Sequence, residues 1–176
     1  GLEDFFIGGA AGQAGTLYKQ NEDGTFILME SETLNNDMDH EDMGAAFFDA
    51  DNDGDLDLYV VSGGNEFRPR SSLYQDRLYL NDGTGEFIKT ENWIPRMNIS
   101  GSKVYPKDFD DDGDMDLFLG GRHLPWSYPD PESSRILVNQ GDKFENLTKD
   151  IAPGLSSIGM VNDAIWVDFN QDDQTD

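Results

Sequence analysis

The feature that most constrains this chain is an acidic segment that recurs along it. Residues 49–60 (DADNDGDLDLYV) and 108–119 (DFDDDGDMDLFL) match position by position, and residues 168–176 match the first nine positions of both. The starting points of the three segments are 59 and 60 residues apart. Self-similarity at such a spacing is typical of a repeat architecture rather than of a single irregular domain.

Two further matches keep the same register. Residues 1–9 align with residues 113–121, which places Asp4 opposite Asp116. A second motif, best preserved as LYLNDGTGEF, follows each acidic segment, and its copies cover residues 17–26, 78–87 and 136–144. The chain therefore contains parts of four copies of one unit, and its first and last copies are incomplete.

Each unit predicts four short antiparallel strands. An apolar strand leaves each acidic loop, and the Asn, Asp and Gly residues before the fourth strand have hairpin-turn chemistry. First strands are expected at 44–48, 104–107 and 161–167, second strands at 2–7, 56–61 and 115–119, third strands at 77–80 and 136–138, and fourth strands from Phe87 and Phe144.

Tandem four-stranded units indicate a β-propeller, and the helical periodicity that an α/β fold requires is missing from the sequence. The predicted fold class is all-β, a propeller fragment of about three blades. Its parts are a partial blade at 1–42, blades at 43–102 and 103–160, and the start of another blade at 161–176.

The acidic loops predict calcium sites. Aspartates at positions 1, 3 and 5 direct carboxylates at one point, Gly at position 6 permits a sharp turn, and a carbonyl at 7 and a carboxylate at 9 complete an all-oxygen shell of the kind that Ca²⁺ takes. The expected side-chain ligands are Asp49, Asp51, Asp53 and Asp57 in the first loop and Asp108, Asp110, Asp112 and Asp116 in the second, with the carbonyls of Asp55 and Asp114.

Other interpretations of the loops fit less well. An EF-hand needs a bidentate Glu at position 12, where this chain has Val60 and Leu119. Mg²⁺ prefers to retain several waters rather than enter a protein cage. Solvated acidic turns without an ion would leave four carboxylates within nine residues to repel one another.

A third loop is a weaker candidate for the same ion. Its expected ligands are Asp168, Asn170, Asp172, Gln174 and Asp176, and Asp173 replaces the glycine. The first copy retains only Asp4 of its loop, so it is expected to bind no ion.

D-x-D-x-D-G-x-x-D between two strands, followed by an apolar strand and Gly-Gly, resembles the FG-GAP repeat of integrin α-subunit propellers. The form with a following L-Y-x-N-x-G-x-G-x-F is similar to the bacterial VCBS/FG-GAP repeats that precede ASPIC/UnbV domains and occur in relatives of cartilage acidic protein. The resemblance implies a Ca²⁺-stabilised propeller, usually of seven blades, in secreted or cell-surface proteins. Two features depart from it: about three blades are present, and Ala46-Phe47 and Val104-Tyr105 stand where Phe-Gly would begin a blade.

Composition restricts the partners. The chain has 12 basic and 36 acidic residues, a net charge of −24, which argues against nucleic acid and against an anionic membrane surface as partners. No run approaches the ~20 apolar residues of a membrane span, so membrane insertion is not expected. With no Cys, disulfides, thiol catalysis and zinc–thiolate sites are excluded. Cations are the natural partners of such a chain.

A protein or glycan ligand is expected on the rim opposite the acidic loops. In a four-stranded meander the second connections, here 62–76 and 120–134, lie on the other rim from the first. They carry basic and aromatic residues suited to sugars or acidic groups, namely Arg68, Arg70, Tyr74, Arg122, His123, Trp126 and Tyr128. The alternative is that the aromatic residues pack between blades and the arginines pair with nearby acids.

Catalysis has little support in the sequence, so no catalytic residue is assigned. His40 and His123 lack a nucleophile–base pattern around them, although an acidic pair of the kind that cleaves glycosides remains open because acids are abundant. A recognition or adhesion module is therefore the main hypothesis, and a Ca²⁺-dependent polysaccharide-binding or polysaccharide-degrading propeller, such as a lyase, is the alternative. The incomplete end blades would expose strand edges, which predicts self-association.

Overall fold

The computed structural model describes residues 2–172 and confirms an all-β fold of three antiparallel sheets. The first sheet is β1 (Phe5–Ile7), β2 (Thr16–Gln20) and β3 (Phe26–Met29). The second is β4 (Asp42–Phe48), β5 (Asp57–Ser62), β6 (Arg77–Asn81) and β7 (Phe87–Lys89). The third is β8 (Gly101–Lys107), β9 (Asp116–Gly121), β10 (Arg135–Asn139) and β11 (Phe144–Asn146).

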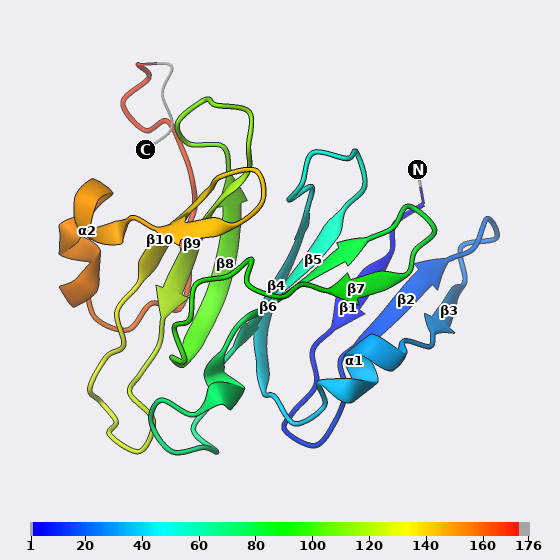
Figure 1. The fold of residues 1–176 in the computed structure, drawn as a ribbon, viewed down its shortest axis with the longest axis horizontal. Coiled ribbons are helices and arrows are strands. Elements are labelled where there is room, and N and C mark those ends of the chain that lie inside the picture. The colour runs from blue at the N-terminus through cyan, green and yellow to red at the C-terminus, as the bar shows by residue number, and fades with distance from the viewer. Residues whose placement is uncertain (1, 173–176) are drawn as a thin grey trace.

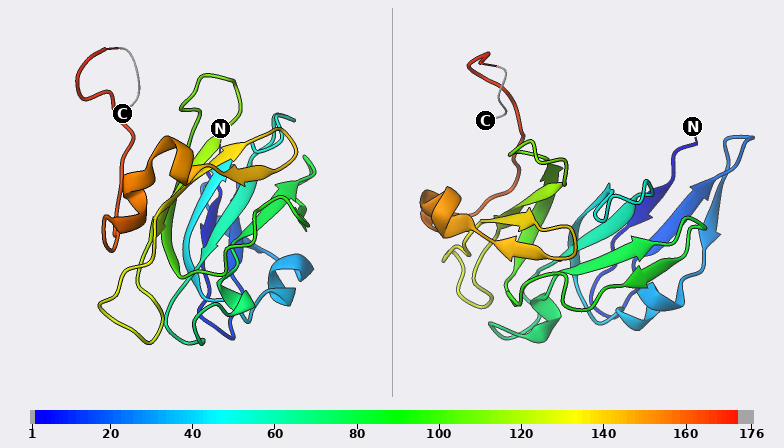
Figure 2. Two further views of the ribbon diagram at one scale, coloured as in Figure 1. Left: turned by 60° about the vertical axis from the view of Figure 1, so that its left-hand side comes forward. Right: turned by 45° about the horizontal axis from the view of Figure 1, so that its top comes forward.

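The three sheets stand side by side in chain order, as blades do (Figures 1 and 2). Each sheet is a meander in which consecutive strands pair. The second and third sheets approach closely where Gly63 bridges to Gly101 in parallel. A Cβ atom on Gly63 would lie 2.5 Å from the carbonyl oxygen of Gly101, so this approach requires glycine.

The core lies in the two seams between the sheets. All six residues of β5 are buried, and successive side chains point to opposite faces. Leu58 and Val60 pack against the first sheet, where Leu17 lies. Tyr59 and Val61 pack against the third sheet. A strand buried on both faces thus explains the continuous apolar run after each acidic loop.

Short helical segments lie between strands or after the last described strand. The α-helices are α1 (Glu32–Asn36) and α2 (Thr148–Ile151), and the 3₁₀ turns are Ser72–Tyr74 and Pro153–Ser157. Ser31 caps α1, because its hydroxyl accepts a hydrogen bond from the Leu34 N–H. Within residues 2–172, no helix has the length and apolar character needed to cross a bilayer.

The strand predicted at 161–167 is wrong. This segment lies against β8, but it is held by isolated contacts instead of a strand ladder. The Ser102 hydroxyl donates to the Val161 carbonyl at 2.7 Å, and the Trp166 indole N–H donates to the Tyr105 carbonyl at 3.2 Å. The apolar pattern was present, but no neighbouring strand pairs with it among the described residues.

Candidate metal centres and the opposite rim

The first acidic loop joins β4 to β5 and is shaped by its own aspartates. The Asp49 carboxylate accepts from the Gly54 N–H at 3.0 Å, and the Asp51 carboxylate accepts from the Asp53 N–H at 3.3 Å. Asn52 and Gly54 have positive φ values of 60° and 97°. Side-chain acceptors that bond to the backbone two to five residues ahead therefore fold the loop tightly.

The second loop, between β8 and β9, repeats this bonding pattern. Asp108 accepts from the Gly113 N–H at 3.1 Å, and Asp110 accepts from the Asp112 N–H at 3.3 Å. Asp111 has a φ of 61° and Gly113 one of 98°, close to their counterparts in the first loop. The two sequences that match position by position thus fold alike.

Each loop brings three carboxylates together. The ligand-type oxygens of Asp49, Asp51 and Asp57 lie within 4.8 Å of one another, as do those of Asp108, Asp110 and Asp116. These six residues were among the predicted ligands, and they occupy positions 1, 3 and 9 of their loops. Two groups that could hold a metal ion therefore lie on one rim of the molecule, at the top of Figure 1.

The carboxylates at position 9 are the most restrained. Asp57 is fully buried and accepts from the Ala50 N–H at 2.7 Å and from the Asn81 N–H at 2.8 Å. Asp116 is also fully buried and accepts from the Asn139 N–H at 2.8 Å. Burial raises the pKa of both carboxyl groups to about 6. A nearby cation would favour their charged forms.

Unpartnered buried oxygens provide an independent test of whether the loops suit a cation. Asp49 Oδ1, Asp108 Oδ1 and Asp116 Oδ2 are buried and lack a hydrogen-bond partner. An unsatisfied buried acceptor is costly, and a charged one more so. The residues present thus fit a divalent cation, since these oxygens belong to the two carboxylate groups.

The remaining predicted ligands are placed differently. Asp53 and Asp112 each accept from the backbone N–H two residues ahead, at 2.9 Å. Neither belongs to a three-carboxylate group. The side chain of Asp114 accepts a hydrogen bond from the Asn52 amide of the first loop, so the two loops touch.

The third loop begins in the same way. Asn170 accepts from the Asp172 N–H at 3.0 Å, and Gln171 has a φ of 63°, as Asn52 and Asp111 do at the equivalent position. Asp168 accepts from the Gln171 N–H at 2.6 Å. The predicted ligands Gln174 and Asp176 lie outside the described residues.

The first sheet preserves the position of the ninth carboxylate. Asp4 accepts from the Gln20 N–H at 2.9 Å, just as Asp57 accepts from Asn81 and Asp116 from Asn139. The alignment that placed Asp4 opposite Asp116 is therefore reproduced in space.

Sequence reasoning missed the role of the two asparagines that end the third strands. The Asn81 and Asn139 N–H groups hold the ninth carboxylates, and their side-chain amides donate to the carbonyls of Leu56 and Met115 at 3.2 and 3.4 Å. The available signal was the Asn of the L-Y-x-N motif, which recurs 24 residues after Asp57 and 23 residues after Asp116.

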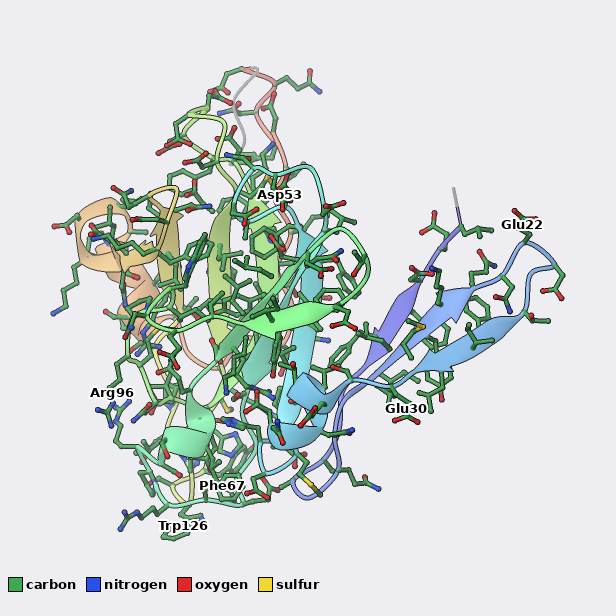
Figure 3. All side chains as sticks on the ribbon, turned by 45° about the vertical axis from the view of Figure 1, so that its right-hand side comes forward. Glu22, Glu30, Asp53, Phe67, Arg96 and Trp126 are labelled. Carbon is green, nitrogen blue, oxygen red and sulfur yellow. The ribbon has the colours of Figure 1, made fainter. Side chains whose placement is uncertain are left out.

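The opposite rim presents two of the predicted aromatic residues. Trp126 and Tyr128 are 65% and 76% exposed, so they do not pack between blades. The Trp126 indole N–H donates to the Asn65 carbonyl at 3.0 Å, which fixes the ring beside the other long connection. Figure 3 shows Trp126 and Phe67 at the end of the molecule away from Asp53.

Other predicted rim residues differ in availability. Tyr74 is 1% exposed, and its hydroxyl donates to the Phe67 carbonyl, so its assignment to a ligand face is corrected to a role inside the loop. Arg70 pairs with Glu132 at 3.5 Å, as the alternative interpretation expected of the arginines. The Arg122 guanidinium contacts the Met43 sulfur at 3.7 Å. Arg68 is exposed, and His123 lies edge-on to Tyr128 with ring centroids 6.1 Å apart.

One serine and one histidine come close together but do not form an activated nucleophile. Ser62 Oγ lies 3.4 Å from His40 Nδ1. The serine is fully buried, and its hydroxyl donates to the Gln75 carbonyl at 2.8 Å. Burial lowers the pKa of His40. The contact is thus a packing contact at the end of β5 in the second sheet.

Comparison with known proteins agrees with the repeat and its loops. The family model for the FG-GAP-like repeat matches residues 1–60 and 64–119, which together make up more than half of the chain. No curated protein matches the sequence. The two matched stretches include both complete acidic loops, all of β4 and β8 and most of β5 and β9, and the chain belongs to the FG-GAP-like repeat family.

Proposed function

We propose that the two complete acidic loops bind Ca²⁺ and that these ions stabilise an extracellular recognition or adhesion module built from integrin-like repeats. The proposal is carried by three buried carboxylate oxygens that lack a hydrogen-bond partner, one on Asp49 in the first loop and two, on Asp108 and Asp116, in the second. Each belongs to a group of three convergent carboxylates.

The donor set favours Ca²⁺ over other common ions. Every side chain in the two groups is a carboxylate, and hard oxygen donors select Ca²⁺ or Mg²⁺ over Zn²⁺ or copper. Mg²⁺ requires near-ideal octahedral geometry and keeps several waters. Loops that offer several carboxylates within nine residues suit the larger, more flexible shell of Ca²⁺.

The protein's own residues prepare the site. Asp57 and Asp116 begin the buried strands β5 and β9, so the ninth carboxylate of each loop is anchored to the sheet core. The carboxylate oxygens of the other members of each group lie within 4.8 Å of that anchor, those of Asp49 and Asp51 in the first loop and of Asp108 and Asp110 in the second. A bound cation would supply the positive charge that offsets the repulsion among these carboxylates.

Calorimetric melting tests the structural role. Because an ion that binds only the folded state stabilises it by mass action, a Ca²⁺ concentration about 100 times the Kd should raise the Tm by about 5 °C or more over excess chelator. Mg²⁺ at the same concentration should raise it less. Superimposable melting curves in chelator and in Ca²⁺ would refute the proposal.

Recognition is proposed for the opposite rim, where Trp126 and Tyr128 are exposed. Exposed aromatic faces beside guanidinium groups suit a glycan or a protein loop. The double variant Trp126→Ala, Arg122→Ala should abolish binding to a ligand found by a glycan or matrix-protein screen and leave the affinity for Ca²⁺ unchanged. If the variant still binds the ligand, the proposal that this rim recognises it is refuted.

The extracellular location and the adhesive role are proposed from the family, because FG-GAP repeats occur in extracellular proteins. Detection of the protein in the medium or on intact cells, by surface labelling, tests the location. Detection only in the interior of the cell would contradict it.

A further inference from the structure

A continuous line of buried hydrogen bonds joins the two candidate metal centres. Asp57 accepts from the Ala50 N–H at 2.7 Å, the Ala50 carbonyl accepts from the Asn139 side-chain amide at 2.8 Å, and the Asn139 N–H donates to Asp116 at 2.8 Å. None of these four residues is more than 1% exposed. The line runs from the ninth carboxylate of one loop to the ninth carboxylate of the next.

Asn139 is the buried residue that crosses the seam, whereas the other bond between the two loops, from Asn52 to Asp114, is exposed. Its amide nitrogen donates to Ala50 in the first loop and to the Met115 carbonyl at 3.4 Å in the second, and its amide oxygen accepts from the Gly141 N–H at 3.0 Å. If Ala50 moved relative to Met115, a buried carbonyl would lose its partner, which is costly in a dry interior. The position of one loop therefore depends on the position of the other.

Asn81 is the internal comparison. It ends the third strand of the second sheet as Asn139 ends that of the third, its N–H holds Asp57, and its amide donates to Leu56. The hydrogen bonds of the described residues show no counterpart of the Asn139–Ala50 bond for Asn81. The two asparagines thus share the bond to the ninth carboxylate and the bond to the carbonyl of the residue before it, and among the described residues only Asn139 also bonds across to the neighbouring sheet.

We propose that Asn139 couples the two loops, so that a cation in one loop raises the affinity of the other for its own cation. This inference rests on the proposed Ca²⁺ binding and goes beyond it, because independent sites would serve a structural role equally well. Ordering of the first loop by an ion fixes Ala50, which fixes the Asn139 side chain and, through its N–H, the Asp116 carboxylate. By thermodynamic reciprocity the effect is the same in the other direction.

Electrostatics opposes this coupling. A cation in the first loop reduces the negative potential that attracts a second cation. That effect is screened over about 8 Å at physiological salt, whereas a link through a neutral amide does not depend on salt. The electrostatic contribution depends on the net charge of the first loop, whereas the contribution through Asn139 depends on its geometry. Variants that match the charge of the filled loop therefore separate the two.

The experiment measures the affinity of the second loop for Ca²⁺ by isothermal titration of the full chain, with and without a functional first loop. The double variant Asp49→Asn, Asp51→Asn removes two negative charges, the same change that one bound divalent cation makes. The second loop thus experiences a matched charge in the two proteins. We expect its affinity to fall about five-fold or more when the first loop cannot fill.

The coupling ratio is the Ca²⁺ affinity of the second loop with a functional first loop divided by its affinity without one. In an Asn139→Ser background this ratio should be close to one, since serine cannot reach the Ala50 carbonyl. Asn81→Ser is the matched control: it should weaken its own loop but leave the ratio as in the unmodified chain. If the ratio is one in the unmodified chain, the coupling is refuted while two bound ions still support the proposed function. If the ratio survives Asn139→Ser, the route through Asn139 is refuted.

A second measurement does not depend on the folding of the Asn139 variant. In a chain with Asp108→Asn and Asp110→Asn, which cannot fill the second loop, Ca²⁺ in the first loop should slow hydrogen exchange of the Asn139 N–H. Unchanged exchange at this amide would refute the coupling. Absence of any Ca²⁺ uptake by the unmodified chain would instead refute the proposed function itself.

Discussion

Two adjacent aspartates of the second loop carry the same charge, but only one of them belongs to a group of three convergent carboxylates. Asp110 belongs to the group with Asp108 and Asp116, whereas Asp111 has a φ of 61° and does not join that group. Asp110→Asn should therefore weaken Ca²⁺ binding by about ten-fold or more, since even residues that only support metal ligands contribute that much. Asp111→Asn makes the same change in net charge and should alter the affinity by less than about two-fold. Equal losses in a titration would show that bulk charge, not geometry, attracts the ion.

A second residue-scale prediction concerns a buried carboxyl group away from the loops. Asp76 accepts from the Ser62 N–H and the Tyr59 hydroxyl, and burial raises its pKa to about 6, despite the opposing charges of Arg77 and Arg135. Because the folded pKa lies above the usual 3.8, this group contributes stability that is full below about pH 4 and is lost as the pH rises through 6.

Asp76→Asn removes this titration. The free energy of unfolding of the unmodified chain, measured in urea with chelator present, should fall relative to that of the variant between about pH 4 and 6. Because both proteins share all other titrating groups, the difference between them isolates Asp76. A difference that is constant with pH, or that grows in favour of the unmodified chain, would contradict the assignment.

At the scale of elements, the seams between sheets should dominate stability. Leu117 in β9 is fully buried at the seam with the second sheet, whereas Ile88 in the outer strand β7 is 62% exposed. Leu117→Ala should lower the free energy of unfolding by about 2–5 kcal/mol. Ile88→Ala should change it by no more than about 0.5 kcal/mol. Similar denaturation midpoints for the two variants would mean that the seam is not the core.

The elements that the sequence predicted well are those with a local signal. β5 and β9 follow from apolar runs after a loop, and the turns before β7 and β11 follow from Asn, Asp and Gly. Helices α1 and α2 were missed because five and four residues are too few to show a helical period. The segment 161–167 was overpredicted because an apolar pattern does not specify a partner strand.

The candidate metal centres were predictable for a similar reason. The three convergent carboxylates of each group lie within a segment of nine residues, so their spacing in the sequence was enough to identify them. The bond from Asn139 to Ala50 spans 89 residues and depends on how two sheets pack. The burial of Tyr74 could not be predicted from the sequence. An aromatic residue in a long connection can either be exposed on the surface or form the core of that connection.

At the scale of the whole molecule, the outer face of the first sheet is built like an interior seam. Phe5 and Ile7 in β1 occupy the positions that Leu58 and Val60 occupy in β5, yet they are 37% and 51% exposed where their counterparts are fully buried. Leu28 in β3 adds to the same exposed face at 49%. An apolar face of this extent rarely stays open to water.

The far side of the third sheet offers a complementary surface. Residues 161–167 lie on it with Ile165 81% exposed, and the groove beneath is lined by Tyr105, Phe118 and Ile136. Because the second sheet packs on the third through equivalent positions, a second copy of the chain can place its first sheet on this side. Two copies joined at both ends would then close a six-sheet ring with two-fold symmetry.

Light scattering on the purified chain tests this association. The ring predicts a monodisperse mass of twice 19.7 kDa, and Phe5→Lys with Ile7→Lys should return the mass to 19.7 kDa, since two buried charges at each joint would not be compensated. Ile88→Lys, on an exposed strand outside the joint, is the matched control and should leave the doubled mass unchanged. A mass of 19.7 kDa for the unmodified chain at micromolar concentration would exclude the ring. The exposed face of the first sheet would then have to be tolerated by an open arc of three sheets.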